Sequence, residues 1–332
     1  MTVSFIHLRV HTEYSLVDGV VRINPLIARV WDPGMPAFGI TDQSNLFGLV
    51  KFYKAARSAG IKPIAGVDVW VDEGDGQPPS RLTLFCQNLA GYRHLTRLVT
   101  RLYREGQRRG TPLLTWEWLA EEGTDGLIAL SGGREGAIGR ALIAGREEQA
   151  RGLVDEALRL FKDRYYLELT RIGHPDERAY LPAAVDLAGR LGVPLVATND
   201  VRFLERSDFE AHEVRVCINR GRLLDDPRRP RDYTAEQFLR SPEQMAELFA
   251  DVPEALANSV EIARRCSLQL QLGENVLPRF PVPDARTPED HLADLARAGL
   301  MQRRDAGRAG AAPAAAYDER LARELAVISG MG

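Results

Sequence analysis

The chain has 332 residues, of which 45% are hydrophobic and 27% are charged, a composition typical of soluble proteins with a large core. Its formal net charge of −3 gives no overall basic character, so any contact with nucleic acid would be local or lie on a part not included here. No run of about 18 apolar residues and no signal peptide occurs, and Cys86, Cys217 and Cys266 show no CxxC spacing, so we expect a cytoplasmic protein with reduced thiols and no membrane contact.

The first predicted strand reads VSFIHLRV and covers residues 3–10. Side chains alternate between the two faces of a strand, so His7, Arg9 and His11 would share one face. This face would carry two possible metal ligands and one permanent cation. The segment therefore raises the question whether a metal or the guanidinium supplies the positive charge.

Short apolar runs then alternate with helical patterns over most of the chain. Further strands are predicted at residues 36–41, 62–71, 81–87, 126–132, 164–170 and 194–200. Helices are predicted between most of them, at about residues 22–32, 46–59, 88–105, 134–144, 146–161, 176–191 and 208–220. Such repeated units predict parallel strands with right-handed crossovers. Their number, about seven, favours a closed or nearly closed β/α barrel.

Aspartates stand near the ends of three predicted strands, where a β/α barrel carries its chemistry: Asp42, Asp68 and Asp200. Together with His7 and His11 they could hold a zinc, manganese or magnesium cluster that activates water for attack on a phosphoester. The alternative is that the histidine spacing arose by chance and that the aspartates cap the following helices.

Three arginines argue against a metal. Arg9 shares the histidine face, Arg81 opens its strand, and Arg202 lies two residues after Asp200. A guanidinium pairs well with a carboxylate, stays protonated and repels a divalent cation. The alternative is that these arginines lie on the surface.

The remaining motifs point to structure. LSGGREGAIGRAL (130–142) lacks the Walker lysine and full dinucleotide-binding spacing, so it is interpreted as a helix-capping turn. His212 lies in a helical stretch and is expected to be packed or at an interface. No Ser/His/Asp or Cys/His nucleophile arrangement occurs.

Beyond about residue 222 the alternation of strands and helices stops. Residues 225–233 are charged and broken by prolines, and helices are predicted near 234–250 and 253–266. Residues 277–290 are typical of a linker. The last helical stretch carries apolar residues without a following partner, so we expect the chain to be cut from a larger protein.

Six motifs occur in order: HLRVHTEYSLVDG, ITDQSNLFGLVKFYKAARSAGIKPIAGVD, LIALSGGREG, VATNDVRF, LDDPRRPR and ELFADVPEALANSVEIARRC. This series resembles the N-terminal part of the catalytic alpha subunits of bacterial DNA polymerase III. The resemblance implies a PHP (polymerase and histidinol phosphatase) domain over residues 1–270, folded as a distorted β/α barrel of about seven strands. A small helical extension would follow, with a linker and the truncated start of the polymerase palm/thumb region over residues 271–332.

The resemblance also implies which residues stand at metal-ligand positions. Metal-binding members of the family hold a trinuclear cluster of His, Asp, Glu and Cys ligands. The positions that keep a ligand, with Asp68 in place of the usual glutamate, are His7, His11, Asp42, Asp68 and Asp200. The positions that have lost theirs are Arg9, Gln43, Arg81, Gly133 and Arg202. This pattern resembles the metal-free class of the domain.

That class occurs in polymerases that proofread with a separate exonuclease subunit. The resemblance therefore implies a non-catalytic scaffold that stabilises the polymerase and binds this subunit, with a vestigial pocket, no catalytic residue and no cofactor in this fragment. The full-length protein would perform DNA-templated DNA synthesis with magnesium, and DNA would be contacted only there. The alternative is an active phosphoesterase or pyrophosphatase with zinc or manganese at His7, His11, Asp42, Asp68 and Asp200.

Overall fold

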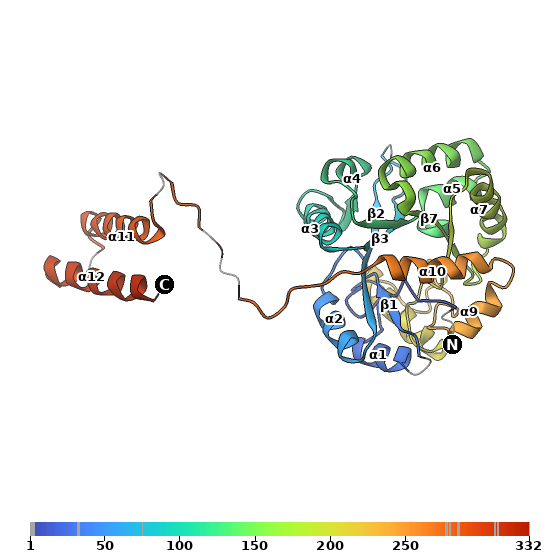
Figure 1. The fold of residues 1–332 in the computed structure, drawn as a ribbon, viewed down its shortest axis with the longest axis horizontal. Coiled ribbons are helices and arrows are strands. Elements are labelled where there is room, and N and C mark those ends of the chain that lie inside the picture. Colours follow the sequence, from blue (N-terminus) through green and yellow to red (C-terminus); the bar gives the residue numbers. More distant parts are fainter. Residues whose placement is uncertain are drawn as a thin grey trace. The chain divides into compact units, whose positions relative to one another are not determined.

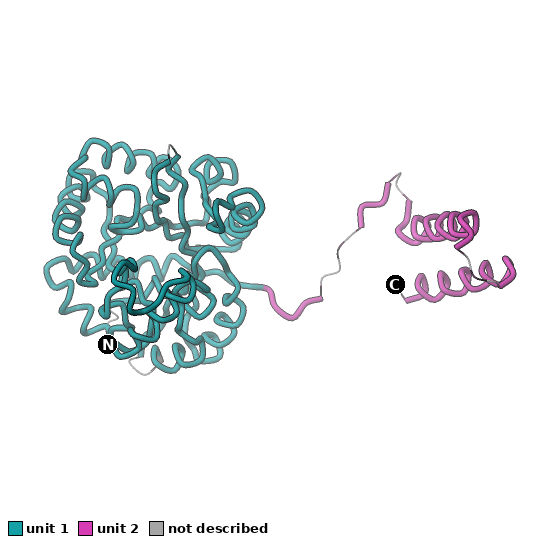
Figure 2. The backbone as a smooth tube through the Cα atoms, turned by 180° about the vertical axis from the view of Figure 1, so that it is seen from behind, with its two compact units in different colours: residues 1–270 teal, residues 271–332 magenta. Residues whose placement is uncertain are grey.

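The computed structural model describes residues 4–31, 34–74, 76–275, 278, 280–283, 286–308, 310 and 312–331. The start of the first predicted strand and part of the predicted linker lie outside these residues. The chain divides into two compact units, residues 1–270 (unit 1) and 271–332 (unit 2), coloured separately in Figure 2. Within the described residues, no helix is both long and apolar enough to cross a membrane.

Unit 1 is built on one mixed sheet of eight strands in its described residues (Figure 1). The strands are β1 (Ala37–Ile40), β2 (Lys62–Val71), β3 (Ser80–Cys86), β4 (Gln107–Arg108), β5 (Thr111–Leu114), β6 (Leu127–Leu130), β7 (Tyr165–Thr170) and β8 (Leu195–Thr198). Their order is β4-β5-β2-β3-β6-β7-β8, and β1 pairs with β2. The predicted α/β class is confirmed, and β4 and β5 form a short hairpin that the sequence pattern did not predict.

The prediction of parallel strands throughout is wrong at β3. This strand runs antiparallel to both β2 and β6, whereas β1–β2, β6–β7 and β7–β8 are parallel. The connection between β2 and β3 spans residues 72–79, and its described residues, 72–74 and 76–79, form no helix. A parallel pair needs a longer crossover, usually with a helix, so this short connection dictates a reversal of direction.

The segment that contains the two N-terminal histidines closes the ring of strands. On one side, the backbone N–H groups of Gly39 and Thr41 donate to the carbonyls of His7 and Val10 (2.8 Å each). On the other side, Val10 forms a parallel bridge with Val201, just after β8. The segment is extended but makes only isolated pairs, which differs from the regular strand predicted there. The ring therefore runs through β1, β2, β3, β6, β7, β8 and this segment, as expected for a barrel.

Helices lie on the outside of the strands (Figure 1). They are α1 (Ile23–Trp31), α2 (Leu49–Ser58), α3 (Leu89–Arg104), α4 (Trp116–Glu122), α5 (Ala137–Ile143), α6 (Glu147–Phe161), α7 (Glu177–Leu191), α8 (Phe209–Arg220), α9 (Pro242–Leu248) and α10 (Pro253–Arg265). Short 3₁₀ helices cover Gly133–Glu135, Lys162–Arg164 and Arg206–Asp208. The helix predicted over residues 234–250 is limited to α9. Unit 2 contains α11 (Pro288–Asp305) and α12 (Ala314–Gly330), which contact each other.

The strands are buried on both of their faces. Every residue of β1, β3, β6, β7 and β8 is buried. The outward side chains pack under the helices and are apolar, as expected for a covered sheet. Several inward side chains are polar or charged, among them Asp68 of β2, Arg81 of β3 and Glu168 of β7. The barrel interior therefore holds charge as well as apolar packing.

Candidate functional site

A cluster of charged side chains occupies the barrel interior, and we call it the arginine–carboxylate network. Its members come from the N-terminal segment, the following loop, β2, β3, β7 and the residues after β8. They are all at most 5% exposed: Arg9, Asp18, Asp68, Arg81, Glu168, Asp200 and Arg202. Three permanent cations thus lie beside four carboxyl groups. Charges at such depth are tolerated only when they are paired and hydrogen-bonded.

Asp68 is the most heavily contacted member. Its Oδ2 accepts hydrogen bonds from Arg81 Nη1 (2.6 Å), Arg9 Nη2 (2.8 Å) and His11 Nε2 (2.9 Å). Its Oδ1 accepts from the Thr83 hydroxyl (2.8 Å). Burial opposes ionisation, but the two guanidinium groups outweigh it and hold the pKa of Asp68 well below its ordinary value. Asp68 is therefore a carboxylate at neutral pH.

Arg9 lies between three carboxyl groups. Besides Asp68, its Nε lies 3.2 Å from Asp200 Oδ1, and its Nη1 lies 3.3 Å from Glu168 Oε1. Burial disfavours the charged guanidinium, but Asp200, Asp68 and Glu168 together raise the pKa of Arg9 well above its ordinary value. Arg9 thus supplies a positive charge at the point where the three acidic side chains converge.

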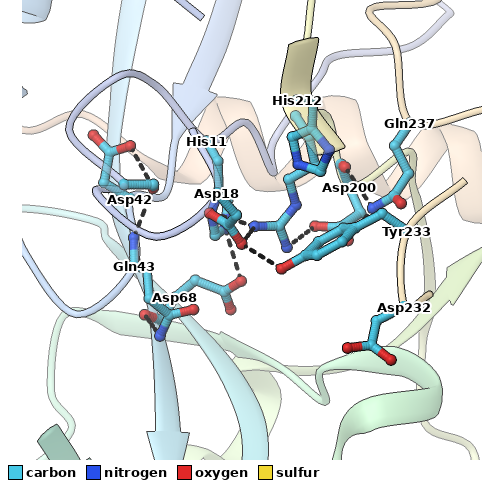
Figure 3. A network of polar contacts seen from close by, with 12 residues as sticks. His11, Asp18, Asp42, Gln43, Asp68, Asp200, His212, Asp232, Tyr233 and Gln237 are labelled. Carbon is cyan, nitrogen blue, oxygen red and sulfur yellow. Dashed lines mark hydrogen bonds and ion pairs between the residues drawn. The ribbon is translucent and has the colours of Figure 1, made fainter. Parts of the chain in front are cut away.

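Arg202 links Asp200 to a further carboxylate, Asp18. Its Nη2 donates to Asp200 Oδ1 (2.7 Å) and its Nη1 donates to Asp18 Oδ2. Tyr233 donates its hydroxyl to Asp18 (2.9 Å), and Gln237 donates its amide to Asp200 (2.8 Å), as Figure 3 shows. Burial acts to raise the pKa values of Asp18 and Asp200, but Arg202 outweighs it, and both pKa values fall below the ordinary range.

Glu168 and Asp18 were not predicted from the sequence. Glu168 accepts a hydrogen bond from the Thr198 hydroxyl (2.5 Å), and Arg9 approaches it only at 3.3–3.4 Å. Burial therefore dominates and raises the pKa of Glu168. Its one signal was a lone acid inside the apolar strand YYLELT, whereas Asp18 precedes a glycine in a segment typical of a turn.

Two of the predicted residues lie apart from the guanidinium groups. The Oδ1 atom of Asp42 accepts from the Thr12 backbone N–H (2.7 Å) and the Ser15 hydroxyl (2.8 Å), and burial raises its pKa. His7 donates from Nε2 to the Arg240 carbonyl (2.8 Å), and burial lowers its pKa to about 4. His7 is therefore neutral at pH 7, and Asp42 holds the N-terminal loop in place.

Gln43 and Gly133 lie at the edge of the network. Gln43 accepts from Arg81 Nη1 (2.9 Å) and donates its amide to the Asp68 backbone carbonyl (3.2 Å). Gly133 has a φ of +58°, a conformation that glycine adopts readily, and a Cβ there would lie 3.7 Å from the Glu168 carbonyl. Both positions thus border the arginine–carboxylate network.

The donor atoms of His11, Asp68 and Asp200 lie within 4.8 Å of one another, close enough in principle to hold a cation. However, Arg9 Nε already donates a hydrogen bond to Asp68 Oδ2 (3.1 Å) and lies 3.2 Å from Asp200 Oδ1. Each unit charge on an incoming ion would repel the guanidinium by about 4 kcal/mol at roughly 4 Å and an effective dielectric of about 20. A divalent cation at these donor atoms would therefore lie against the Arg9 guanidinium.

Residues 7–172 match the PHP domain family. Over 305 residues, the chain is 53% identical to DNA polymerase III subunit alpha of Pseudomonas aeruginosa, with 91% of this chain and 26% of that protein covered. The same subunit of Escherichia coli K12 is 49% identical over 339 residues, with 99% and 28% covered. The chain thus spans little more than a quarter of the length of these curated relatives. Among solved structures, an amidohydrolase from Chromobacterium violaceum has a TM-score of 0.41 and 15% identity over 59% of this chain and 87% of that chain. The similarity to the polymerase subunits confirms the predicted resemblance. The match over residues 7–172 shows that the chain belongs to the PHP domain family.

Proposed function

We propose that this chain is a scaffold region of a replicative DNA polymerase alpha subunit, in which an internal ion network replaces the metal cluster of the PHP pocket. The observation that carries the proposal is the position of Arg9 between Asp68, Glu168 and Asp200. A guanidinium there supplies the charge that divalent ions would otherwise supply, and it excludes them by repulsion and by occupying the shared oxygens.

The network has a structural role in this proposal. It ties the N-terminal segment, which makes only isolated backbone pairs, to β2, β3, β7 and the residues after β8. Removal of one partner leaves an uncompensated buried charge, at a cost of about 3–5 kcal/mol. The pocket then has no catalytic residue and no cofactor of its own.

The relatives named DNA polymerase III subunit alpha support the wider role. In the full-length protein, this barrel supports the polymerase region, where DNA-templated synthesis with magnesium takes place and where DNA is bound. The barrel also binds the proofreading exonuclease subunit, in the cytoplasm. Binding of that subunit to the purified chain in a gel-filtration or calorimetric assay tests this part of the proposal, and the absence of binding at micromolar concentrations would refute it.

Metal analysis tests the substitution of guanidinium for metal. The purified chain is loaded with zinc or manganese and dialysed, and the retained ions are measured by mass spectrometry. We expect well under about one ion per chain, because the ligand set is incomplete. The matched variant carries Arg9→His, Gln43→His, Arg81→His and Arg202→His and should retain more metal. Stoichiometric metal on the unmodified chain would contradict the proposal.

A metal-dependent phosphoesterase is the second candidate, favoured by the proximity of His11, Asp68 and Asp200. It predicts hydrolysis of a generic phosphomonoester that EDTA inhibits and that Asp200→Asn abolishes. A rate equal to that of the buffer blank at high protein concentration would eliminate this candidate.

A further inference from the structure

The arginine–carboxylate network lies at an end of the barrel where side chains are usually accessible. Strands β6, β7 and β8 are parallel, so their C-terminal ends lie at one edge of the sheet. In β/α barrels, this edge carries the site and faces solvent. Asp200 and Arg202 follow shortly after β8, yet they are only 5% and 0% exposed. Another part of the chain therefore covers this end of the barrel.

A segment between α8 and α9 supplies the cover, and we call residues 232–240 the strap. The strap forms no helix, and it is bonded to residues that follow the strands. Arg134, shortly after β6, donates from Nη2 to the Asp232 carbonyl (3.3 Å). The Thr234 hydroxyl donates to the carbonyl of Ile172, which follows β7. The strap thus crosses the C-terminal ends of β6 and β7.

The strap is paired most extensively with the residues after β8. The side-chain amide of Asn199 donates to the backbone carbonyls of Glu236 (2.9 Å) and Phe238 (2.8 Å). Between them, the Gln237 carbonyl accepts from the backbone N–H of Arg202 (2.9 Å). The strap therefore lies directly against the segment that follows β8.

Two side chains of the strap contact the network directly (Figure 3). Tyr233 donates its hydroxyl to Asp18 Oδ2 (2.9 Å), and its ring centroid lies 5.6 Å from the guanidinium carbon of Arg202. Gln237 donates its amide to Asp200 Oδ2 (2.8 Å). These two side chains occupy the positions from which water would otherwise reach the carboxylates. The strap is thus both a part of the network and its boundary with solvent.

The strap is held less firmly than the strands beneath it. From Gly221 to Ser241 the chain forms no helix, and only Gln237 and Leu239 are buried there. Segments with few buried side chains open locally at a lower free energy than the whole fold. The strap can therefore open while the barrel stays folded.

We propose that the strap closes the barrel interior, so that ions and small molecules reach the arginine–carboxylate network only when the strap opens locally. The inference deepens the proposed function, because it adds a steric barrier to the electrostatic one at Arg9. For the phosphoesterase candidate, opening of the strap would be the step that admits the substrate. Access can be measured without metal or activity, so the barrier and the proposed function can fail separately.

Thiol labelling with methyl methanethiosulfonate measures access to the interior. Thr83 is 0% exposed and donates its hydroxyl to Asp68 Oδ1 (2.8 Å), so Thr83→Cys places a thiol inside the network. Cys86 lies on the same strand, is equally buried and packs in the apolar core, so its labelling reports unfolding of the barrel itself. Mass spectrometry follows both thiols in the same molecules.

Local opening of the strap predicts different responses at the two positions. Residue 83 should be labelled at least about tenfold more slowly than in the urea-unfolded chain, but faster than Cys86. Tyr233→Phe removes the hydroxyl that donates to Asp18 and should accelerate labelling at residue 83 by at least about tenfold. Phe161→Leu is the control, because it weakens the core under α6 and should accelerate labelling at Cys86 without accelerating it at residue 83.

Three results would overturn the inference. Labelling of residue 83 at the rate of the unfolded chain would show that the interior is open. An unchanged rate in Tyr233→Phe would show that another segment is the barrier. Equal rates at residue 83 and Cys86 in every variant would show that the interior is reached only by unfolding of the barrel.

Hydrogen exchange tests the same inference without a substitution in the network. The Leu239 N–H donates to the Phe203 carbonyl (3.1 Å) and so joins the strap to the residues after β8. This N–H should exchange faster than the amides of β7 in the unmodified chain, because the strap opens without the barrel. Exchange at the same rate as the β7 amides would overturn the inference, even if Thr83→Cys does not fold.

Discussion

Replacement of Arg9 by methionine isolates the contribution of the central guanidinium. Methionine keeps most of the length of the side chain but removes its charge and all its donors. Asp68 and Asp200 would each lose one of their guanidinium partners, and Glu168 would lose its only one among the described residues. Since all three carboxyl groups are at most 5% exposed, water cannot replace the lost donors without opening the barrel.

The expected loss follows from this burial. Breaking a buried ion pair by removing one partner costs about 3–5 kcal/mol, a substantial part of the stability of a typical domain. Arg97→Met is the control, because Arg97 also forms an ion pair, with Glu122 at 2.7 Å, but its side chain is 53% exposed. An exposed pair contributes about 1 kcal/mol or less.

Urea denaturation at pH 7 measures the free energy of unfolding of both variants. The pH dependence gives a second readout. Asp68 and Asp200 have pKa values below the ordinary range, so their ionisation stabilises the fold above about pH 4, and this contribution is lost as the pH falls through the folded-state values. In Arg9→Met, the folded-state pKa values of Asp68 and Asp200 rise toward the unfolded-state values, so the variant should lose less stability in acid than the unmodified chain. If Arg9→Met costs no more than Arg97→Met, the network is not the stabilising element that we infer.

Three further outcomes are expected. Asp68→Asn should cost about 3–5 kcal/mol because it leaves two guanidinium groups under-compensated. Glu168→Gln should cost less, because Arg9 approaches Glu168 only at 3.3–3.4 Å and burial opposes the ionisation of Glu168. Equal losses in urea denaturation would contradict this order. Tyr233→Phe removes the hydroxyl that donates to Asp18 and should cost about 1.5–3 kcal/mol in the same assay. Burial lowers the pKa of His7 from 6.5 to about 4. The neutral side chain therefore stabilises the fold above pH 6.5, and this stabilisation is lost as the pH falls toward 4. In His7→Gln, the difference in the free energy of unfolding between pH 7 and pH 5 should be smaller by about 2 kcal/mol.

Several features of the fold follow from the sequence pattern. The alternation of short apolar runs with amphipathic stretches predicted most strands and helices of unit 1, because strands that are covered by helices need apolar side chains on the covered face. The same local rule placed His7, Arg9 and His11 on one side of an extended segment. Arg9 and His11 do contact the same oxygen, Oδ2 of Asp68.

The candidate site depended on contacts over long sequence separations. Arg9, Asp68, Glu168 and Asp200 are distributed over more than half of the chain, and only the register of the closed ring brings them together. Register is set by backbone pairing and side-chain packing across strands, which no local pattern encodes. Glu168 was not predicted as a site residue, because the prediction considered carboxylates at strand ends and Glu168 lies inside β7. Only the register of the ring places it beside Arg9.

By itself, the sequence determined the element types, the barrel class and the presence of arginines where ligands were expected, since these depend on local periodicity and on motifs read in order. Only the tertiary structure decided that β3 is antiparallel, that the segment with the two histidines closes the ring, and that Arg9 lies between three carboxyl groups while Asp42 and His7 are bound elsewhere. The physical reason is that a buried charge is compensated by whatever group the fold brings within about 3 Å, and that distance is fixed by chain closure rather than by neighbouring residues.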